Sequence, residues 1–230
     1  MDGEKWLNKF IFEITAKESK IQGQDKLLMY SQKLLKKYNI LCNIDSEIRY
    51  MGGEVLIISN HPTIFDIPIV INSLSIINPQ ILNNLKVLVS EKTYPYYTKY
   101  FGNERFYKAE KSPKVITETF KQMAEHINNT GSILMFPTSY TGMNNNNEEV
   151  HFGNGFGHLL RISDNDIQIC SISIVPESKI KFNPIKRRKN KVLVNIKLSQ
   201  KSDWLPENFR ELSNANINAH LLNVYSKLHN

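Results

Sequence analysis

Short apolar runs alternate along the chain with longer segments in which hydrophobic residues recur every three or four positions. The short runs are typical of strands buried on both faces of a sheet, and the longer segments are typical of amphipathic helices. Strands are predicted at 40–50, 55–58, 86–90, 132–136, 167–175 and 191–198. This order predicts a single α/β domain in which helices flank a mixed, largely buried sheet.

Two amphipathic helices, 4–20 and 24–38, are predicted before the first strand. They either cover the core or form a basic platform on a membrane surface, with Trp6 and Phe10 entering the headgroup layer. The two roles are compatible. We therefore separate 1–38, an N-terminal helical pair, from the α/β domain at 39–230, within one folding unit.

Further helices are predicted from their first residues. Pro62 suits the first position of a helix at 63–77, while Ser112 and Ser213 are N-cap residues for a helix at 113–128 and for the last helix. A short Gly-rich helix is expected at 153–162. The segment 91–111, rich in Tyr and Lys, is expected to be a loop.

The charge balance favours an anionic partner. The chain has 29 Lys and Arg against 22 Asp and Glu, a net charge of +7. Lipid headgroups, an acidic protein or a phosphorylated substrate fit this charge, whereas no helix-turn-helix or aromatic–basic motif supports nucleic-acid binding. Two cysteines outside any C-x-x-C give no disulfide framework or zinc site. Without 18 consecutive apolar residues or a signal-type leader, the expectation is a cytoplasmic protein, with peripheral contact to the inner membrane face as an option.

His61 and Asp66 form an H-x-x-x-x-D motif directly after the apolar run at 55–58. Open α/β sheets place their sites at the carboxyl ends of strands. Asp66 can accept a hydrogen bond from one ring nitrogen of His61, which fixes the tautomer and leaves the other nitrogen as a general base. Because no G-x-S-x-G motif is present, the pair suits deprotonation of a substrate's own hydroxyl or amine.

The segment LIISNHPTIFDIPIV resembles the first signature of the glycerolipid acyltransferases, the family of 1-acylglycerol-3-phosphate acyltransferase. ILMFPTSYTGM resembles the family's strand followed by F-P-E-G-T-R. VHFGNGFGHLL, SISIVPESKI and NKVLVNIKLSQKSDW resemble its later segments in the same order. The resemblance, over about 40–198, implies an acyltransferase-like fold and transfer of a fatty acyl chain from acyl carrier protein or acyl-coenzyme A to a hydroxyl or amine. It implies His61 as the base, Asp66 as its orienting partner, and no metal or cofactor beyond the acyl donor.

The chain departs from the family after Phe136-Pro137, where Thr138-Ser139-Tyr140-Thr141 replaces Glu-Gly-Thr-Arg. In the family this loop and an upstream Arg are associated with the acceptor's phosphate. The candidate substrate-binding residues here are Asn60, Arg105, Lys108, Thr138, Ser139 and Thr141. The two cations are alternatively solvated loop charges, and the three hydroxyls alternatively turn residues.

Two functions remain open from the sequence. One is an acyltransferase whose acceptor is a non-phosphorylated alcohol or amine. The other is a catalytically degenerate family member that binds lipid or acyl carrier protein. A basic run, Lys179 to Lys191, lies between the last two predicted strands and is either a solvated hairpin tip or a dock for an acidic carrier protein or anionic lipid.

Overall fold

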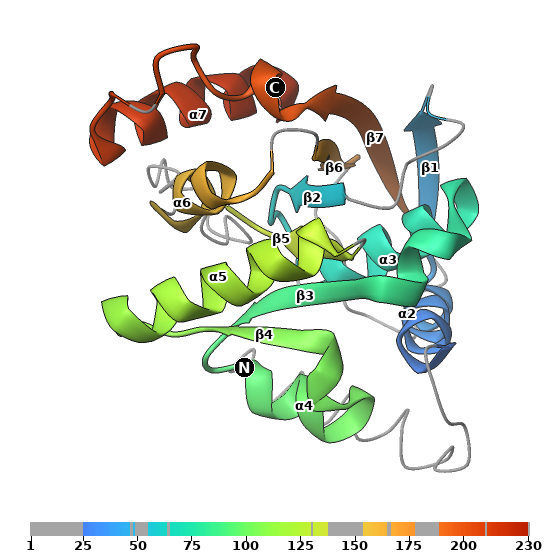
Figure 1. Cartoon of the computed structure of the whole chain (residues 1–230). Coiled ribbons are helices and arrows are strands. Elements are labelled where there is room, and N and C mark those ends of the chain that lie inside the picture. The colour runs from blue at the N-terminus through green and yellow to red at the C-terminus, as the bar shows by residue number, and fades with distance from the viewer. Residues whose placement is uncertain are drawn as a thin grey trace.

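The computed structural model describes residues 25–46, 48, 55–63, 65–129, 131–137, 154–164, 167–177, 189–209 and 211–229. Seven strands form one sheet in the order β1-β7-β6-β2-β5-β3-β4 (Figure 1). Their bounds are β1 Ile40–Ser46, β2 Val55–Ser59, β3 Leu85–Ser90, β4 Phe106–Ala109, β5 Ser132–Met135, β6 Gln168–Pro176 and β7 Asn190–Gln200. The predicted mixed α/β sheet is confirmed.

The directions of the strands show at which edge of the sheet a functional site is expected. Every neighbouring pair of strands is parallel except β6 and β7, which are antiparallel. Strands β2, β3, β4, β5 and β6 therefore all end at the same edge, where β7 and β1 begin. We call this the carboxyl edge, and the opposite one the amino edge.

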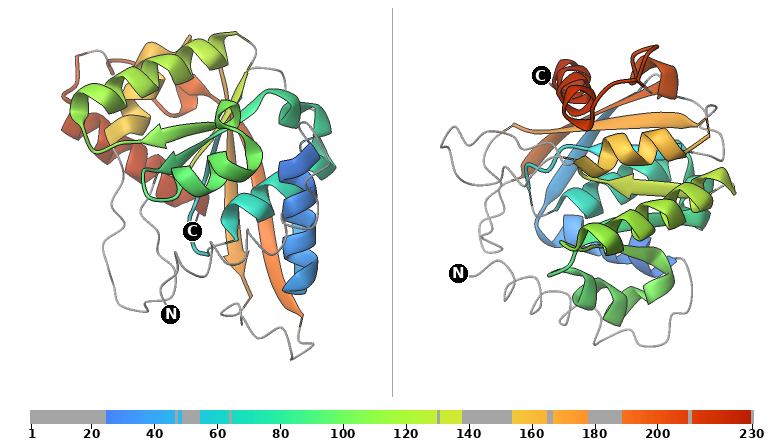
Figure 2. Two further views of the ribbon diagram at one scale, coloured as in Figure 1. Left: turned by 90° about the horizontal axis from the view of Figure 1, so that it is seen from below. Right: turned by 60° about the vertical axis from the view of Figure 1, so that its left-hand side comes forward.

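Helices cover both faces of the sheet. Their bounds are α2 Asp25–Lys37, α3 Asp66–Ile77, α4 Tyr94–Phe101, α5 Pro113–Asn128, α6 Asn154–Ile162 and α7 Asn214–His229, with 3₁₀ helices η1 Pro79–Asn84, η2 Asn103–Arg105 and η3 Lys201–Asp203. Helices α2 and α3 lie on one side of the sheet, and α5, α6 and α7 lie on the other (Figure 2). Within the described part of the chain, no helix is long and apolar enough to cross a bilayer.

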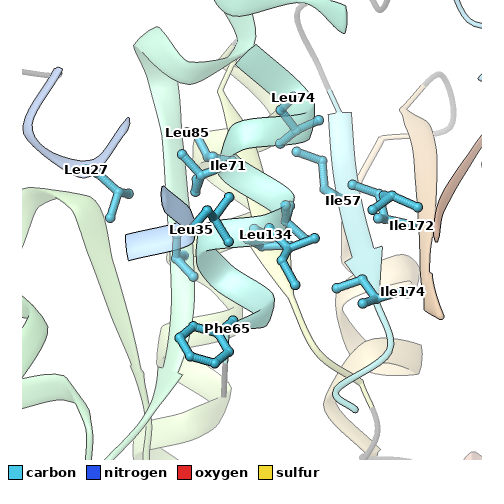
Figure 3. Close-up of a cluster of buried hydrophobic side chains, with 14 of the residues drawn as sticks. Leu27, Leu35, Ile57, Phe65, Ile71, Leu74, Leu85, Leu134, Ile172 and Ile174 are labelled. Atoms are coloured by element: carbon cyan, nitrogen blue, oxygen red, sulfur yellow. The ribbon is translucent and has the colours of Figure 1, made fainter. Parts of the chain in front are cut away.

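Alternation along the strands divides the core between these two faces. In β2, Val55 and Ile57 pack toward α2 and α3, whereas Leu56 and Ile58 pack toward α5 and α6; all four side chains are fully buried. Figure 3 shows the first cluster, in which α3 lies against β2, β5 and β6. Burial on both faces explains why β2 is a continuous apolar run. Because β2 is packed on both faces, the position where the chain leaves it, after Ser59, is well defined.

Several predicted boundaries are wrong. The first strand ends at Ser46 rather than at residue 50, and α3 begins at Asp66 rather than directly after Pro62. Thr63 uses its amide and hydroxyl in local side-chain hydrogen bonds, which compete with the helical pattern. Ser112 occupies the N-cap position of α5 without a side-chain capping bond. The cap at Ser213 is confirmed, because its hydroxyl accepts from the Asn216 amide at 3.2 Å.

The segment 91–111 is not a loop, because it contains α4, η2 and β4. Its tyrosines and phenylalanines are spaced for burial. Tyr97 and Phe101 share one buried face of α4, and Phe106 opens β4 with its ring 5.1 Å from that of Tyr97. The helix predicted at 24–38 is α2, but the helix predicted at 4–20 lies outside the described residues.

The core between the sheet and helices α5, α6 and α7 depends on Trp204. Trp204→Ala should lower the free energy of unfolding by about 3–5 kcal/mol. The side chain is fully buried, its ring meets Phe156 edge-on at 5.5 Å, and its indole N–H donates to the Ser199 hydroxyl at 2.8 Å. Urea denaturation followed by circular dichroism measures the loss. The matched control is Ile76→Ala, at a 64% exposed position of α3, which should change stability by less than about 0.5 kcal/mol. Equal effects of the two changes would contradict this assignment of the core.

Candidate active site

Asn60 fixes the chain where β2 leaves the sheet. Its side-chain Nδ2 donates to the Ile174 carbonyl at 2.9 Å, and its Oδ1 accepts from the Ile174 amide at 2.7 Å. These two bonds continue the pairing of β2 with β6 beyond Ser59, the last residue in the ladder. The side chain therefore supports the backbone of His61. Both polar atoms of the side chain make these backbone bonds.

Asp66 is fully buried at the start of α3 and is surrounded by donors. The Thr63 amide lies 3.1 Å from Oδ1 and 3.0 Å from Oδ2, and the Thr63 hydroxyl lies 2.6 Å from Oδ1. Nδ1 of His61 lies 2.6 Å from Oδ2. Burial has the largest effect and leaves the pKa of Asp66 above its ordinary value, although the interactions with His61 and Thr63 lower it. An ionised carboxylate accepts from all of these groups at once.

The His61 ring is held on two sides. Because the Asp66 carboxylate accepts, Nδ1 of His61 carries the proton, and the lone pair of the neutral ring lies on Nε2. The ring packs against Phe136, the first residue after β5, with centroids 4.9 Å apart and planes tilted by 34°. The His61 side chain is 32% exposed, whereas Asp66 is completely covered. A buried, oriented carboxylate beneath a solvent-accessible imidazole is an arrangement suited to a general base.

Several aromatic residues are buried in the core near Asp66. Burial and the nearby charge of Asp66 raise the pKa of Tyr97, so its hydroxyl stays neutral. Phe65, the residue directly before Asp66, is fully buried and packs against Tyr38 at 5.1 Å between centroids. Asp66 itself is fully buried, and the low local dielectric strengthens its interaction with His61.

The structure does not bring Arg105 to His61. Arg105 directly precedes β4 and so lies at the amino edge, where its Nη1 donates to the carbonyls of Leu82 at 2.8 Å and Leu85 at 3.2 Å. Its guanidinium holds η1 and the start of β3 together. The expected phosphate contact by Arg105 conflicts with this placement, because His61 follows β2 at the carboxyl edge.

Lys108 lies nearer the carboxyl edge but on the terminal strand, which β5 and β3 separate from β2. Its ammonium pairs with the Glu110 carboxylate and lies 5.9 Å from the ring centroid of Tyr94. The hydrogen bond with Glu110 raises the pKa of Lys108. Thr138, Ser139 and Thr141 lie outside the described residues, as does most of the basic run.

Two residues of this arrangement were not singled out from the sequence. Thr63 and Asp66 have the T-x-x-D spacing of a capping box, a signal that was present but unused. Phe136 belongs to the F-P pair of the acyltransferase resemblance. Nothing in its spacing indicates that its ring packs on His61, because the two residues follow different strands and meet only through the parallel pairing of β2 with β5.

No known protein-family profile matches the chain, and no curated protein matches it in sequence. Among solved structures it is similar to the 1-acyl-sn-glycerophosphate (LPA) acyltransferase PlsC from Thermotoga maritima. That similarity has 13% sequence identity and a TM-score of 0.46, and it covers 98% of this chain and 97% of PlsC.

Asn60→Ala should destabilise the protein by about 1–3 kcal/mol, because it leaves the buried amide and carbonyl of Ile174 without their side-chain partners. Chemical denaturation measures the change. The control Asn43→Ala, at an exposed position of β1, should be within about 0.5 kcal/mol of wild type. A stable Asn60→Ala protein whose defect is confined to acceptor KM would instead support the substrate-binding role expected from the sequence.

Proposed function

We propose that the chain is an acyltransferase in which His61 deprotonates a hydroxyl or amine acceptor. The observation that carries the proposal is the 2.6 Å contact between His61 Nδ1 and the fully buried Asp66 carboxylate, at the carboxyl edge of the sheet. The H-x-x-x-x-D motif within a segment resembling the glycerolipid acyltransferase signature supports the same reaction class.

In the proposed reaction, Nε2 of His61 takes the acceptor's proton as the acceptor oxygen or nitrogen attacks the carbonyl carbon of an acyl thioester. The tetrahedral intermediate collapses, the carbon–sulfur bond breaks, and His61 returns the proton to the departing thiolate. Asp66 holds the ring in the required tautomer and stabilises the imidazolium between the two transfers. Nε2 of His61 exchanges the proton, whereas Asp66 acts through its contact with Nδ1.

Direct transfer to the acceptor fits the chain better than an acyl-cysteine intermediate. The only cysteines are Cys42 and Cys170. Burial raises the pKa of Cys42 to about 11 and that of Cys170 to about 12, so both are thiols at neutral pH. A thiol is a poor nucleophile compared with its thiolate. The proposal therefore assigns the attack to the acceptor itself.

The donor in this proposal is acyl carrier protein or acyl-coenzyme A, and the acceptor is a lipid or small molecule. The net charge of +7 favours both an acidic carrier protein and peripheral contact with an anionic membrane. Most of the basic run lies between β6 and β7. Glu177, which directly follows β6, and Lys189, which directly precedes β7, both lie at the carboxyl edge with His61. Docking at this edge would deliver the thioester on the side where the base lies.

The described arginines and Lys108 give little support for a phosphorylated acceptor. A phosphate dianion is bound best by bidentate Arg contacts. The two arginines in the described part of the chain, Arg105 and Arg161, both donate to backbone carbonyls. Lys108 is paired with Glu110. We therefore propose a non-phosphorylated alcohol or amine as the acceptor.

His61→Ala should lower the rate of acyl transfer by about 10²–10⁴-fold, the usual contribution of a general base. Asp66→Asn should also be severe, because its amide can present an N–H to Nδ1 and favour the wrong tautomer. The rates are measured by release of free thiol from the donor in the presence of acceptor. His220→Ala, on α7, is the control and should leave the rate unchanged. A folded His61→Ala protein with the wild-type rate would refute the mechanism.

With equal concentrations of lysophosphatidate and its dephosphorylated monoacylglycerol, we expect acylation of the monoacylglycerol to dominate. The reason is the lack of a described Arg directed toward His61. Product masses from the mixed reaction give the ratio. Arg105→Ala should leave the ratio unaltered, since Arg105 lies at the amino edge. A preference for lysophosphatidate that disappears in Lys108→Ala or Arg105→Ala would overturn this choice of acceptor.

A further inference from the structure

We infer that Thr63 is a positioning residue for the catalytic pair, with its hydroxyl setting the orientation of the Asp66 carboxylate toward His61. The inference rests on the proposed function for its kinetic consequences. Its structural content is independent of that function, because it concerns the hydrogen bonds among His61, Thr63, Phe65 and Asp66 and the tautomer of the His61 ring.

The direction of the hydroxyl proton follows from its neighbours. The Phe65 amide donates to the Thr63 Oγ1 at 2.9 Å, so that oxygen acts as an acceptor on one side. On the other side it lies 2.6 Å from Asp66 Oδ1, an acceptor. The hydroxyl proton is therefore directed to Asp66, giving a chain from the Phe65 amide through Thr63 to the carboxylate. Thr63, Phe65 and Asp66 are all buried, so water does not compete for these bonds.

The hydroxyl supplies an orientation that the backbone cannot. The Thr63 amide is almost equidistant from the two Asp66 oxygens, at 3.1 and 3.0 Å, and so holds the carboxylate without fixing the rotation of its plane. The Thr63 hydroxyl contacts Oδ1, and the His61 ring contacts Oδ2. Rotating the carboxylate plane would break both short contacts. The Thr63 hydroxyl on Oδ1 and the His61 ring on Oδ2 together fix the rotation of the carboxylate plane.

Accepting an amide hydrogen bond near the start of α3 does not use the proton of this hydroxyl. The N-cap residue of α3 is Phe65, whose side chain makes no capping bond, and Thr63 lies two residues before it. The amide that Thr63 accepts from belongs to Phe65, which is outside the helix. The hydroxyl proton then remains for Asp66, the residue that contacts the proposed base.

Thr63→Val tests the inference, because it keeps the branched shape and removes the hydroxyl. We expect kcat to fall by about 10–100-fold, as when other partners that orient a functional histidine are removed, with little change in KM. The acid limb of the pH–rate profile should move to higher pH, because the lost O–H dipole had its positive end toward the pair and opposed its protonation. Thr63→Ser should restore most of the rate and the position of the limb.

The ring nitrogen signals of His61 in a ¹⁵N NMR spectrum give a readout that needs no activity. At a pH where the ring is neutral, the wild type should show the Nδ1–H tautomer, and Thr63→Val should show a mixture of tautomers. Thr98→Val, whose hydroxyl bonds to carbonyls of its own helix, is the matched control and should match wild type in every measurement.

The outcomes separate this inference from the proposed function. If no acyl transfer is found but Thr63→Val alters the His61 tautomer, the positioning role stands and the proposed reaction fails. If Thr63→Val keeps the wild-type tautomer, the same pH–rate profile and the same kcat, the inference is overturned. A loss of stability alone, with kcat and tautomer unchanged, would overturn it as well, because that is the result of a purely structural role.

Discussion

The bond between His61 Nδ1 and the Asp66 carboxylate is the interaction on which the site depends. A carboxylate completely removed from water is unfavourable unless donors replace its hydration. Here the replacement comes from one short turn, in which His61 and Thr63 supply every assigned donor. The requirement to satisfy Asp66 therefore explains why α3 starts at that residue, after a turn rather than directly after Pro62.

The sheet places this turn where chemistry is possible. Strand β2 is buried on both faces and ends at the carboxyl edge, and Asn60 extends its pairing with β6 by two side-chain bonds. Phe136, which directly follows the neighbouring β5, packs against the imidazole. The result is a carboxylate in a dry environment and an imidazole that reaches solvent. In the proposed reaction, that difference in burial lets Asp66 orient the ring while His61 exchanges protons.

Local sequence patterns predicted the parts of the protein that local forces determine. The apolar run of β2, the candidate pair that follows it and the amphipathic face of α5 could all be recognised from spacing. The predictions that were wrong concern residues whose placement depends on contacts distant in sequence. Arg105 was a plausible phosphate ligand until parallel pairing placed it at the amino edge, and the aromatic spacing of 94–106 indicates burial only once α2 is seen beside it. Thr63 had a usable T-x-x-D signal, but its effect on Asp66 required the atomic geometry.

The proposed reaction depends on the His61–Asp66 pair as the base for acyl transfer. Its most direct test is mass spectrometry of products formed from acyl carrier protein thioesters or acyl-coenzyme A with a panel of alcohols and amines. We expect an acceptor whose mass has increased by the acyl group, formed by the wild type and not by His61→Ala. Binding of the thioester without any acylated acceptor across the panel would contradict it and indicate a lipid- or carrier-binding protein.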